Sequence, residues 1–292
     1  KETIFLPQQY RFYYQAEFPT SKDWNEVKLP FSRALNKMTE INEQLIFNLN
    51  RRGNAGLENF YISKSNHLAV STIKNCENWP AKKLLLMGPT GSGKSHLAEF
   101  WAEKTRALII SMSDIFNSDI IELSQYAGLL LDNVDDLKLL DPVEKVIIEE
   151  KLFHLLNSTS QSSCYFLMTS SSNILSWGLK LKDLISRLET IAVAELLTPD
   201  DELLVAVLLK QFDDRQIKVS PEFVLFVSKR INRSFYSISE FVNLIDYLTL
   251  KRKKEVTIPI ASQLLDSLDK SNNTDVLNDD FDSFLERSGL VG

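Results

Sequence analysis

One eight-residue motif constrains the fold of this chain more than any other feature: Gly88-Pro89-Thr90-Gly91-Ser92-Gly93-Lys94-Ser95. The apolar run 84–87 precedes it, and residues 96–104 follow with helical spacing. A strand, a glycine-rich loop and a helix in this order cradle phosphates with backbone N–H groups and a helix N-terminus. In such a loop Lys94 reaches the β- and γ-phosphates, and the Ser95 hydroxyl binds Mg²⁺. The sequence therefore predicts a nucleoside-triphosphate site.

Composition sets the class of protein around this motif. The 292 residues are 44% hydrophobic and 25% charged, which suits one large α/β domain and a smaller one. The net charge of −6 argues against a surface devoted to nucleic acid. Cys76 and Cys164 lack metal-ligand spacing, so we expect reduced thiols in a reducing compartment. No run approaches the ~20 apolar residues of a membrane helix, and no secretory pattern begins the chain. We expect a cytoplasmic protein without membrane association.

A second motif follows the apolar run 128–131, which ends in Asp132 and Asn133. A carboxylate after a buried parallel strand lies at the carboxyl edge of the sheet, where ligands bind in open α/β folds. Strands that end in aspartate are common, so this motif gains its meaning from the phosphate loop upstream. We expect Asp132 to hold Mg²⁺ directly or through water, together with Ser95.

The order of elements predicts an α/β fold with a five-stranded parallel sheet flanked by helices, followed by a small all-helical lid. Further strands are expected at 107–111, 164–171 and 190–194, and helices at 67–77, 115–126, 142–159 and 181–188. From about residue 196 the pattern is all helical, at 200–213, 221–231, 235–253 and 259–268. Ser65, Thr198 and Ser220 are the expected helix caps. The domain prediction is therefore a nucleotide-binding domain at 57–196 and a lid at 197–270.

Two polar positions in the predicted α/β domain have alternative interpretations. The fourth strand ends in hydroxyls, and Ser170 either orients a water near the γ-phosphate or belongs to an ordinary strand-end turn. The helix 181–188 presents Arg187, which is either a functional cation or a solvated surface arginine. The residues alone do not choose between these interpretations.

The ends of the chain differ in character from its middle. Residues 1–42 are rich in aromatics without a clean period, and we expect a poorly ordered extension there. Residues 43–50 contain Gln44 followed by Leu45, Phe47 and Leu49, a pattern similar to the peptide that bacterial replication proteins insert into the sliding clamp. The alternative is an alternating strand. Residues 271–292 are acidic and polar, so we expect a disordered tail.

Several of these segments together resemble an AAA+ ATPase of the DnaA type, over about residues 43–268. The segments are 60–66, the phosphate loop with His96 and Leu97, the Asp132 strand, 185–188 and Pro199. With a clamp-type peptide and no DNA-binding domain after the lid, the pattern is most similar to the Hda-type members, the DnaA-like proteins of regulatory inactivation of DnaA. The stretches 199–202, 214–216 and 233–235 resemble alphaproteobacterial members in particular.

The resemblance implies roles for individual residues. Phe60, Tyr61 and Ile62 would line the adenine pocket, and His96 would belong to the nucleotide site with the loop residues. Ser170 or a neighbour would be the sensor, and Arg187 would be an arginine finger supplied in trans. The implied ligands are ADP or ATP with Mg²⁺.

The resemblance also implies a function, namely negative regulation of replication initiation. Such a protein binds the sliding clamp, the β subunit of DNA polymerase III, and stimulates hydrolysis of DnaA-bound ATP. Its implied partners are the clamp, DnaA and other copies of itself, without sequence-specific DNA binding. The alternatives are a helicase loader of the DnaC type or another DnaA-like AAA+ ATPase.

Two positions depart from the family pattern. DnaA has a second acidic residue where this chain has Asn133, and an amide cannot act as a general base. We therefore expect weak or no intrinsic ATP hydrolysis unless Asp135 substitutes. The lid arginine of DnaA aligns closest to Tyr236, with Arg233 one helical turn away. The sequence leaves open which of these two residues senses the nucleotide, and whether ADP or ATP is the working ligand.

Overall fold

The computed structural model describes residues 61–252 and 256–270. Phe60, the predicted clamp peptide at 43–50, the extension 1–42 and the tail 271–292 lie outside the described residues. Within the described part, no helix combines the length and the hydrophobicity needed to cross a membrane.

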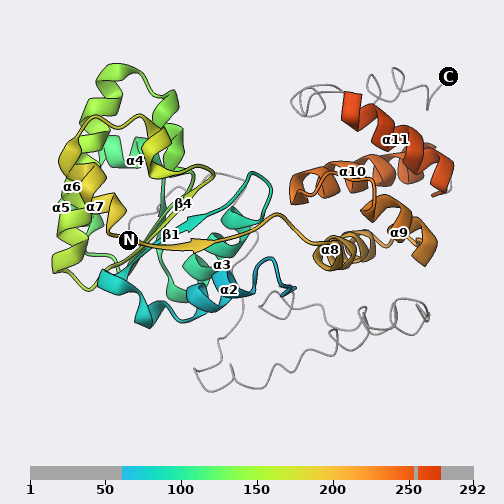
Figure 1. Ribbon diagram of the computed structural model, residues 1–292, viewed down its shortest axis with the longest axis horizontal. Coiled ribbons are helices and arrows are strands. Elements are labelled where there is room, and N and C mark those ends of the chain that lie inside the picture. Colours follow the sequence, from blue (N-terminus) through green and yellow to red (C-terminus); the bar gives the residue numbers. More distant parts are fainter. Residues whose placement is uncertain (1–60, 253–255, 271–292) are drawn as a thin grey trace, which may run out of the picture. The chain divides into compact units, whose positions relative to one another are not determined.

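A five-stranded, all-parallel sheet forms the centre of the α/β part, in the order β2-β3-β4-β1-β5 (Figure 1). Its strands are β1 (Lys83–Met87), β2 (Leu108–Ile110), β3 (Gly128–Leu131), β4 (Tyr165–Ser170) and β5 (Ala192–Glu195). This arrangement confirms the predicted fold class, a parallel five-stranded sheet flanked by helices.

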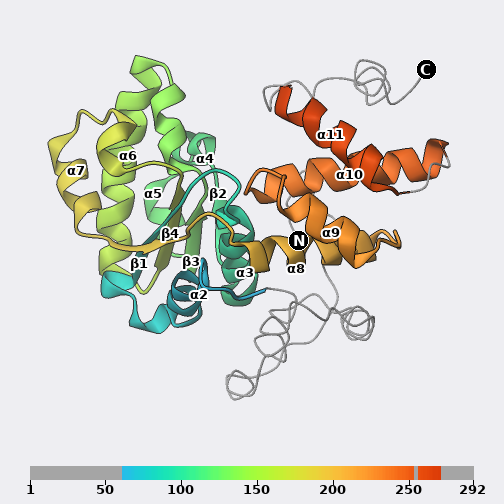
Figure 2. The ribbon, with the colours of Figure 1, turned by 45° about the vertical axis from the view of Figure 1, so that its right-hand side comes forward.

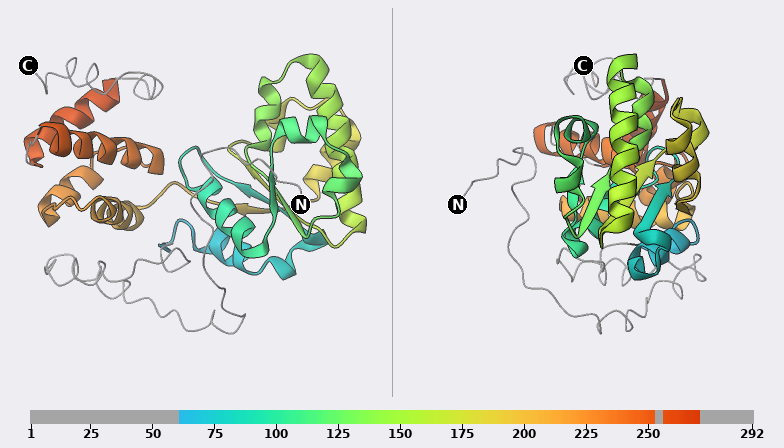
Figure 3. Two further views of the ribbon diagram at one scale, coloured as in Figure 1. Left: turned by 180° about the vertical axis from the view of Figure 1, so that it is seen from behind. Right: turned by 90° about the vertical axis from the view of Figure 1, so that its left-hand side faces the viewer.

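Helices cover both faces of the sheet, as the turned views show (Figures 2 and 3). One face packs against α2 (His67–Lys74) and α3 (Lys94–Thr105). The other packs against α4 (Met112–Asn117), α5 (Ile120–Leu123), α6 (Pro142–Gln161) and α7 (Lys182–Glu189). Short 3₁₀ turns lie at Cys76–Asn78, Pro80–Lys82, Val134–Leu139 and Ile174–Trp177.

The alternation of side chains along β1 shows why its sequence is continuously apolar. Leu84 and Leu86 pack with the α2 and α3 side, whereas Leu85 packs with the α6 side. Successive residues of a strand point to opposite faces, and both faces of this parallel sheet are covered. The strand before the phosphate loop is therefore fixed from two sides.

The remaining helices form an all-helical lid with its own apolar core. They are α8 (Asp201–Asp214), α9 (Pro221–Ser228), α10 (Phe235–Arg252) and α11 (Ile258–Lys270). Phe212, Phe223 and Phe241 are fully buried at its centre. The Ser220 hydroxyl accepts the Phe223 N–H at 3.2 Å and caps α9, as predicted.

The prediction of a single helix at 115–126 is wrong. The structure has two short helices in this region, α4 and α5. Ser118 is extended (φ −88°, ψ 161°), so α4 ends at Asn117. The Asp119 carboxylate then accepts the Ile121 N–H at 2.8 Å and caps α5. The apolar period continues through Ser118 and Asp119, but the Asp119 carboxylate bonds to the backbone and starts a new helix there.

Two predicted helix caps are also wrong, each by one or two residues. Asn66 rather than Ser65 precedes α2, which ends at Lys74 rather than at 77. Asp200 rather than Thr198 caps α8, because its carboxylate accepts the Leu203 N–H at 2.9 Å. The same carboxylate accepts the Ser65 N–H at 3.2 Å and so ties α8 to the segment before α2.

Leu152→Ala should destabilise the fold, because Leu152 is fully buried on α6 against the sheet. We expect a loss of ~2–5 kcal/mol in the free energy of unfolding, from lost burial and the cavity left behind. Urea-induced unfolding followed by circular dichroism measures it. Leu175→Ala is the matched control, since Leu175 is 76% exposed and should change stability by less than ~0.5 kcal/mol. Equal losses in both variants would contradict this core assignment.

Candidate nucleotide-binding site

The loop between β1 and α3 has the conformation of a phosphate cradle. Gly91 and Gly93 adopt left-handed backbone angles, with φ of 75° and 92°. A Cβ at Gly88 would lie 2.5 Å from the Leu196 carbonyl oxygen, and one at Gly93 would lie 2.7 Å from the Phe235 ring. Glycine at these positions lets the backbone make turns and approaches that a side chain would prevent.

Lys94 is buried at the first residue of α3, where its ammonium donates to the carbonyl oxygens of Gly88 (2.8 Å) and Pro89 (3.0 Å). Burial lowers the pKa of Lys94, while the carboxylates of Asp135 and Asp132 act in the opposite direction. The Ser92 hydroxyl is buried in the same loop without a hydrogen-bond partner among the described residues. A cation and an unused donor inside a turn of backbone amides suit a phosphate group.

Asp132 lies at the carboxyl end of β3 and connects three segments of the chain. The Ser95 hydroxyl donates to its carboxylate at 2.8 Å, and the Asn133 amide donates at 3.3 Å. The Thr169 hydroxyl at the end of β4 also donates to this carboxylate, and it accepts the Asn133 N–H at 2.8 Å. The predicted metal-binding pair, Ser95 and Asp132, is therefore in direct contact.

The oxygen atoms of Ser95 and Asp132 fit Mg²⁺, a hard cation that takes hydroxyl and carboxylate ligands. The described residues contain no cluster of three or more histidine, cysteine or acidic residues that could hold a metal. Mg²⁺ at a nucleotide needs few protein ligands, because water and phosphate oxygens complete its shell.

Ser170, the predicted sensor, does not meet Asp132 in the structure. Its hydroxyl donates to the Ser172 carbonyl oxygen at 2.6 Å, and its own carbonyl oxygen accepts the Gly88 N–H at 3.2 Å. Its neighbour Thr169 lies beside Asp132 instead. The sequence predicted Ser170 or a neighbour for this role and did not single out Thr169. The register of the sheet is the signal that finds Thr169. Leu131 pairs with Met168, so the residues that follow them, Asp132 and Thr169, come side by side.

Asn133 has a left-handed backbone, with φ 52° and ψ 52°. Asparagine tolerates this region better than most residues, because its short polar side chain bonds locally. The turn places the Asn133 side chain next to the Asp132 carboxylate. An amide there can donate a hydrogen bond but cannot accept a proton from water.

Asp135 is buried in the turn that follows Asn133. It accepts the Ser171 N–H (3.2 Å), the Ser171 hydroxyl (2.6 Å) and the Ser172 hydroxyl (3.0 Å). Lys138 lies 3.6 Å from the same carboxylate. Burial by itself raises the pKa of Asp135, but the serine hydrogen bonds outweigh it and hold the pKa below its ordinary value. Its oxygens anchor the end of β4, so a role as general base would require breaking these bonds.

The residues predicted to contact the adenine and the loop lie near α8. Burial, followed by the negative charges of Asp214 and Asp213, raises the pKa of Tyr61. Desolvation of the ring, followed by the Lys210 cation, lowers the pKa of His96. Ile62 packs on the apolar cluster of α2 and α3.

The start of α10 contacts the phosphate loop. The Phe235 N–H donates to the Gly91 carbonyl oxygen at 2.8 Å, and Ser234 leaves no room for a Cβ at Gly91. Arg233 forms an ion pair with Asp201 at 2.5 Å. These contacts bring the lid segment that contains both sensor candidates to the loop.

Tyr236, the other sensor candidate, donates its hydroxyl to Glu240 at 2.9 Å. Burial and this hydrogen bond raise the pKa of Tyr236 to about 12. Arg233 and Tyr236 thus each have an acidic partner within the lid, and the choice between them stays open.

Arg187 is exposed on α7, and the structure does not bring it to the phosphate loop. The buried Glu149 carboxylate fixes the start of α7 by accepting the N–H groups of Lys180 (2.9 Å) and Leu181 (2.7 Å). Burial, and with it the positive charge of Arg187, lowers the pKa of Lys83, the first residue of β1. Arg187 lies in the last turn of α7, and β5, the strand after α7, starts beside Leu84 near the amino end of β1. The phosphate loop leaves the carboxyl end of β1, ~13 Å away.

No protein-family model matches the chain. An uncharacterized protein of Haemophilus influenzae is 27% identical over 232 residues, which cover 77% of this chain and 99% of that protein. The replication initiator DnaA of Tropheryma whipplei is 25% identical over 233 residues. That match covers 72% of this chain and 48% of DnaA, so the chain spans about half the length of the DnaA relatives.

Solved structures show the same fold at lower identity. Domain III of Thermotoga maritima DnaA superimposes with a TM-score of 0.59 at 20% identity, covering 73% of this chain and 96% of that domain. AMPPCP-bound DnaA from Aquifex aeolicus gives 0.57 at 17% identity, covering 75% and 73%. The fold is therefore that of DnaA domain III, and in sequence the chain is similar to DnaA.

Asp135→Asn should destabilise the protein at neutral pH by ~1–3 kcal/mol, because it removes a charged acceptor from three buried hydrogen bonds. The folded pKa of Asp135 is below its ordinary 3.8. Its stabilisation is therefore present above that pH and is lost as the pH falls through the folded pKa. Urea unfolding of wild type and variant between neutral and acidic pH should show the difference shrinking.

Asp136→Asn is the control at the neighbouring position, because the fold shifts the pKa of Asp136 in the opposite direction from that of Asp135. Burial and the charge of Asp135 raise the pKa of Asp136, so its charged form is disfavoured by the fold. Removing that charge should leave stability at neutral pH unchanged or slightly higher. Equal destabilisation by both substitutions would show that the serine hydrogen bonds are not what holds Asp135.

Proposed function

We propose that this protein is an adenine-nucleotide-dependent regulator of replication initiation that stimulates hydrolysis of ATP bound to DnaA. In the proposal it holds its own nucleotide at the phosphate loop and presents Arg187 to a partner. The separation of these two sites along β1 is the observation that supports the proposal most strongly. An exposed arginine at the opposite end of the strand is badly placed for the nucleotide of its own chain.

Adenine-nucleotide binding is supported by the loop itself. Lys94, the unused Ser92 donor and the glycine turns suit the phosphates, and Ser95 with Asp132 would hold Mg²⁺. When bound, Mg²⁺ neutralises the phosphate charge. DnaA of Aquifex aeolicus binds the ATP analogue AMPPCP on the same fold.

Weak or absent self-hydrolysis is supported by the residues next to Asp132. Asn133 replaces the acidic residue of DnaA-type sequences, and the Asp135 carboxylate is engaged by two serines. A protein that retains its nucleotide without rapid turnover suits a regulator better than a motor.

The action on DnaA is supported by the chemistry of the guanidinium. A planar cation stabilises the charge that develops on the equatorial oxygens of a transferring phosphoryl group. In the described ranges no carboxylate pairs with Arg187, and Glu149 holds the start of its helix in place. Recruitment to the sliding clamp is proposed from Gln44, Leu45, Phe47 and Leu49, which lie outside the described residues.

Lys94→Ala should abolish measurable ADP and ATP binding, a loss of at least ~100-fold, because it removes the cation fixed inside the cradle. Isothermal titration calorimetry with Mg²⁺ present measures the affinity. Lys104→Ala, at the other end of α3, is the matched control and should bind as wild type. Unchanged affinity in the Lys94 variant would reject the nucleotide site.

Replacement of Gln44, Leu45 and Phe47 by alanine should release the protein from the sliding clamp without lowering its melting temperature. The reason is that the peptide precedes the predicted nucleotide-binding domain. Surface plasmon resonance on immobilised clamp, together with thermal unfolding, measures both quantities. A large drop in melting temperature with clamp binding intact would mean that the peptide is structural instead.

Arg187→Ala should remove most of the stimulated hydrolysis of DnaA-bound ATP, at least ~10-fold, or about 1.4 kcal/mol of barrier. Nucleotide affinity and clamp binding of the variant should stay unchanged. The assay follows DnaA-bound ATP in the presence of DNA-loaded clamp. Lys182→Ala, an exposed cation on the same helix, should retain full stimulation. Full stimulation by the Arg187 variant would exclude the finger role.

A further inference from the structure

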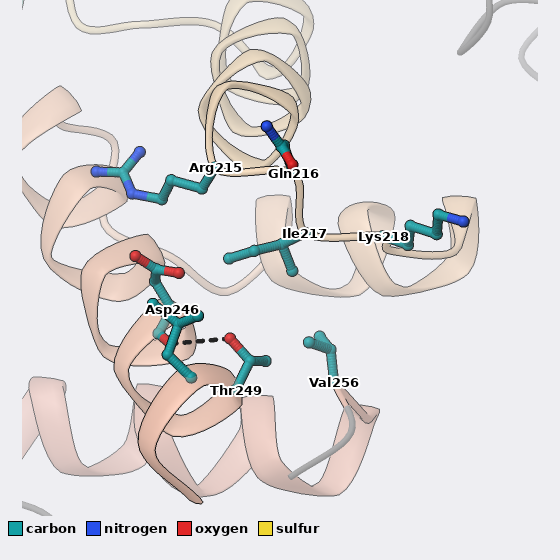
Figure 4. A pocket seen from close by; sticks show the side chains of 8 residues that line it. Arg215, Gln216, Ile217, Lys218, Asp246, Thr249 and Val256 are labelled. Carbon is teal, nitrogen blue, oxygen red and sulfur yellow. Dashed lines mark hydrogen bonds between the residues drawn. The ribbon is translucent and has the colours of Figure 1, made fainter. Parts of the chain in front are cut away.

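A pocket of about 510 Å³ lies in the lid, away from the phosphate loop (Figure 4). It is formed by the segment after α8, one side of α10 and Val256, two residues before α11. Its lining comprises Arg215, Gln216, Ile217, Lys218, Asp246, Thr249, Leu250 and Val256. None of these residues belongs to the proposed nucleotide site, and the function proposed above does not use them.

The charge of this pocket is mainly positive, although the chain carries a net charge of −6. The Arg215 guanidinium donates to the Gln211 carbonyl oxygen (3.1 Å) and the Asn243 side chain (2.6 Å), both uncharged. Lys218 is exposed, and neither cation forms an ion pair within the described ranges. Asp246 is the acidic residue of the lining. Two cations and one carboxylate leave the lining with a net positive charge, which favours an anionic ligand.

Apolar side chains complete the pocket. Ile217 and Val256 are half-buried, and Leu250 is 74% exposed on α10. In Figure 4 the Thr249 and Val256 side chains lie below the Ile217 side chain. A large exposed leucine beside cations suits a peptide that has both apolar and acidic side chains. A nucleic-acid backbone would pair with the cations but would leave the leucine uncovered.

The chain itself contains such a peptide. Residues 271–292 include five acidic residues and one basic residue. Within them, residues 279–286 read Asp-Asp-Phe-Asp-Ser-Phe-Leu-Glu, with aromatic side chains at Phe281 and Phe284. Acidic residues therefore flank apolar anchors on both sides.

We propose that the lid pocket binds residues 279–286 of the same chain. Phe281 and Phe284 would cover the apolar lining around Leu250, and the flanking carboxylates would face Arg215 and Lys218. The peptide and the pocket are complementary. The peptide has apolar anchors and excess negative charge, and the pocket has an apolar lining and excess positive charge.

The connection is long enough for this contact. The pocket includes Val256, near the start of α11, and α11 has 13 residues and a length of ~20 Å. The ten residues between Lys270 and Phe281 can span up to ~33 Å when extended. The peptide can therefore return along α11 to the pocket of its own lid.

Hydrogen–deuterium exchange of the full chain tests the proposal. In the variant Phe281→Ser/Phe284→Ser, the amides of residues 215–219 should exchange about tenfold faster than in the wild type. The matched control is Leu290→Ser/Val291→Ser, which removes apolar residues from the same segment and should leave exchange at 215–219 unchanged. Equal exchange in wild type and both variants would overturn the proposal.

A charge exchange separates direct contact from an indirect effect. Lys218→Glu should lose protection at 215–219, and adding Asp280→Lys to it should restore protection at least in part. Asp246→Asn should keep or increase protection, because it removes a like charge. Loss of protection on dilution would assign the peptide to a second copy, and protection gained only with added duplex DNA would assign the pocket to nucleic acid. Either result would overturn binding within one chain.

Discussion

The hydrogen bond between Ser95 and Asp132 holds together the part of this protein on which the site depends. It joins the first turn of α3 to the carboxyl end of β3, residues 37 positions apart in the sequence. Thr169 adds the end of β4 to the same carboxylate. The first turn of α3 and the carboxyl ends of β3 and β4 thus present polar groups at one edge, where helix N-termini and strand ends meet in folds of this kind. The buried leucines of β1 pack against the helices on both faces and so position the strand that leads to that edge.

The phosphate cradle and the Arg187 guanidinium lie at opposite ends of β1. At its carboxyl end the glycine turns and Lys94 form a cradle for phosphates, and at its amino end Arg187 lies near Lys83. The proposed function follows from this separation, because a cation that cannot reach its own nucleotide is available to another molecule. Asn133 agrees with this division, since an amide beside Asp132 gives the chain little means of activating water by itself.

Much of this arrangement is predictable from sequence, and the exceptions have physical reasons. The strand, loop and helix around residues 84–104 follow from one apolar run, three glycines and a helical period, and the sheet follows from repeated runs of that kind. Neighbouring residues of a strand face opposite sides, so only one of Thr169 and Ser170 can contact Asp132. The register between β3 and β4, which the sequence does not give, decides that it is Thr169. The break at Ser118 was missed because a capping pair competes with a continuing apolar period. The hydrogen bonds that Ser171 and Ser172 donate to Asp135 join residues 36 or more positions apart, so no local pattern predicts them.

The central claim is that the Ser95 and Asp132 pair belongs to a Mg²⁺-dependent adenine-nucleotide site. Calorimetric titration of ADP into the full-length chain, with and without Mg²⁺, tests it most directly. The account predicts one ADP per chain, tighter binding when Mg²⁺ is present, and loss of that Mg²⁺ dependence in Asp132→Asn. No binding of ADP under either condition, or binding that ignores both Mg²⁺ and the Asp132 substitution, would contradict it.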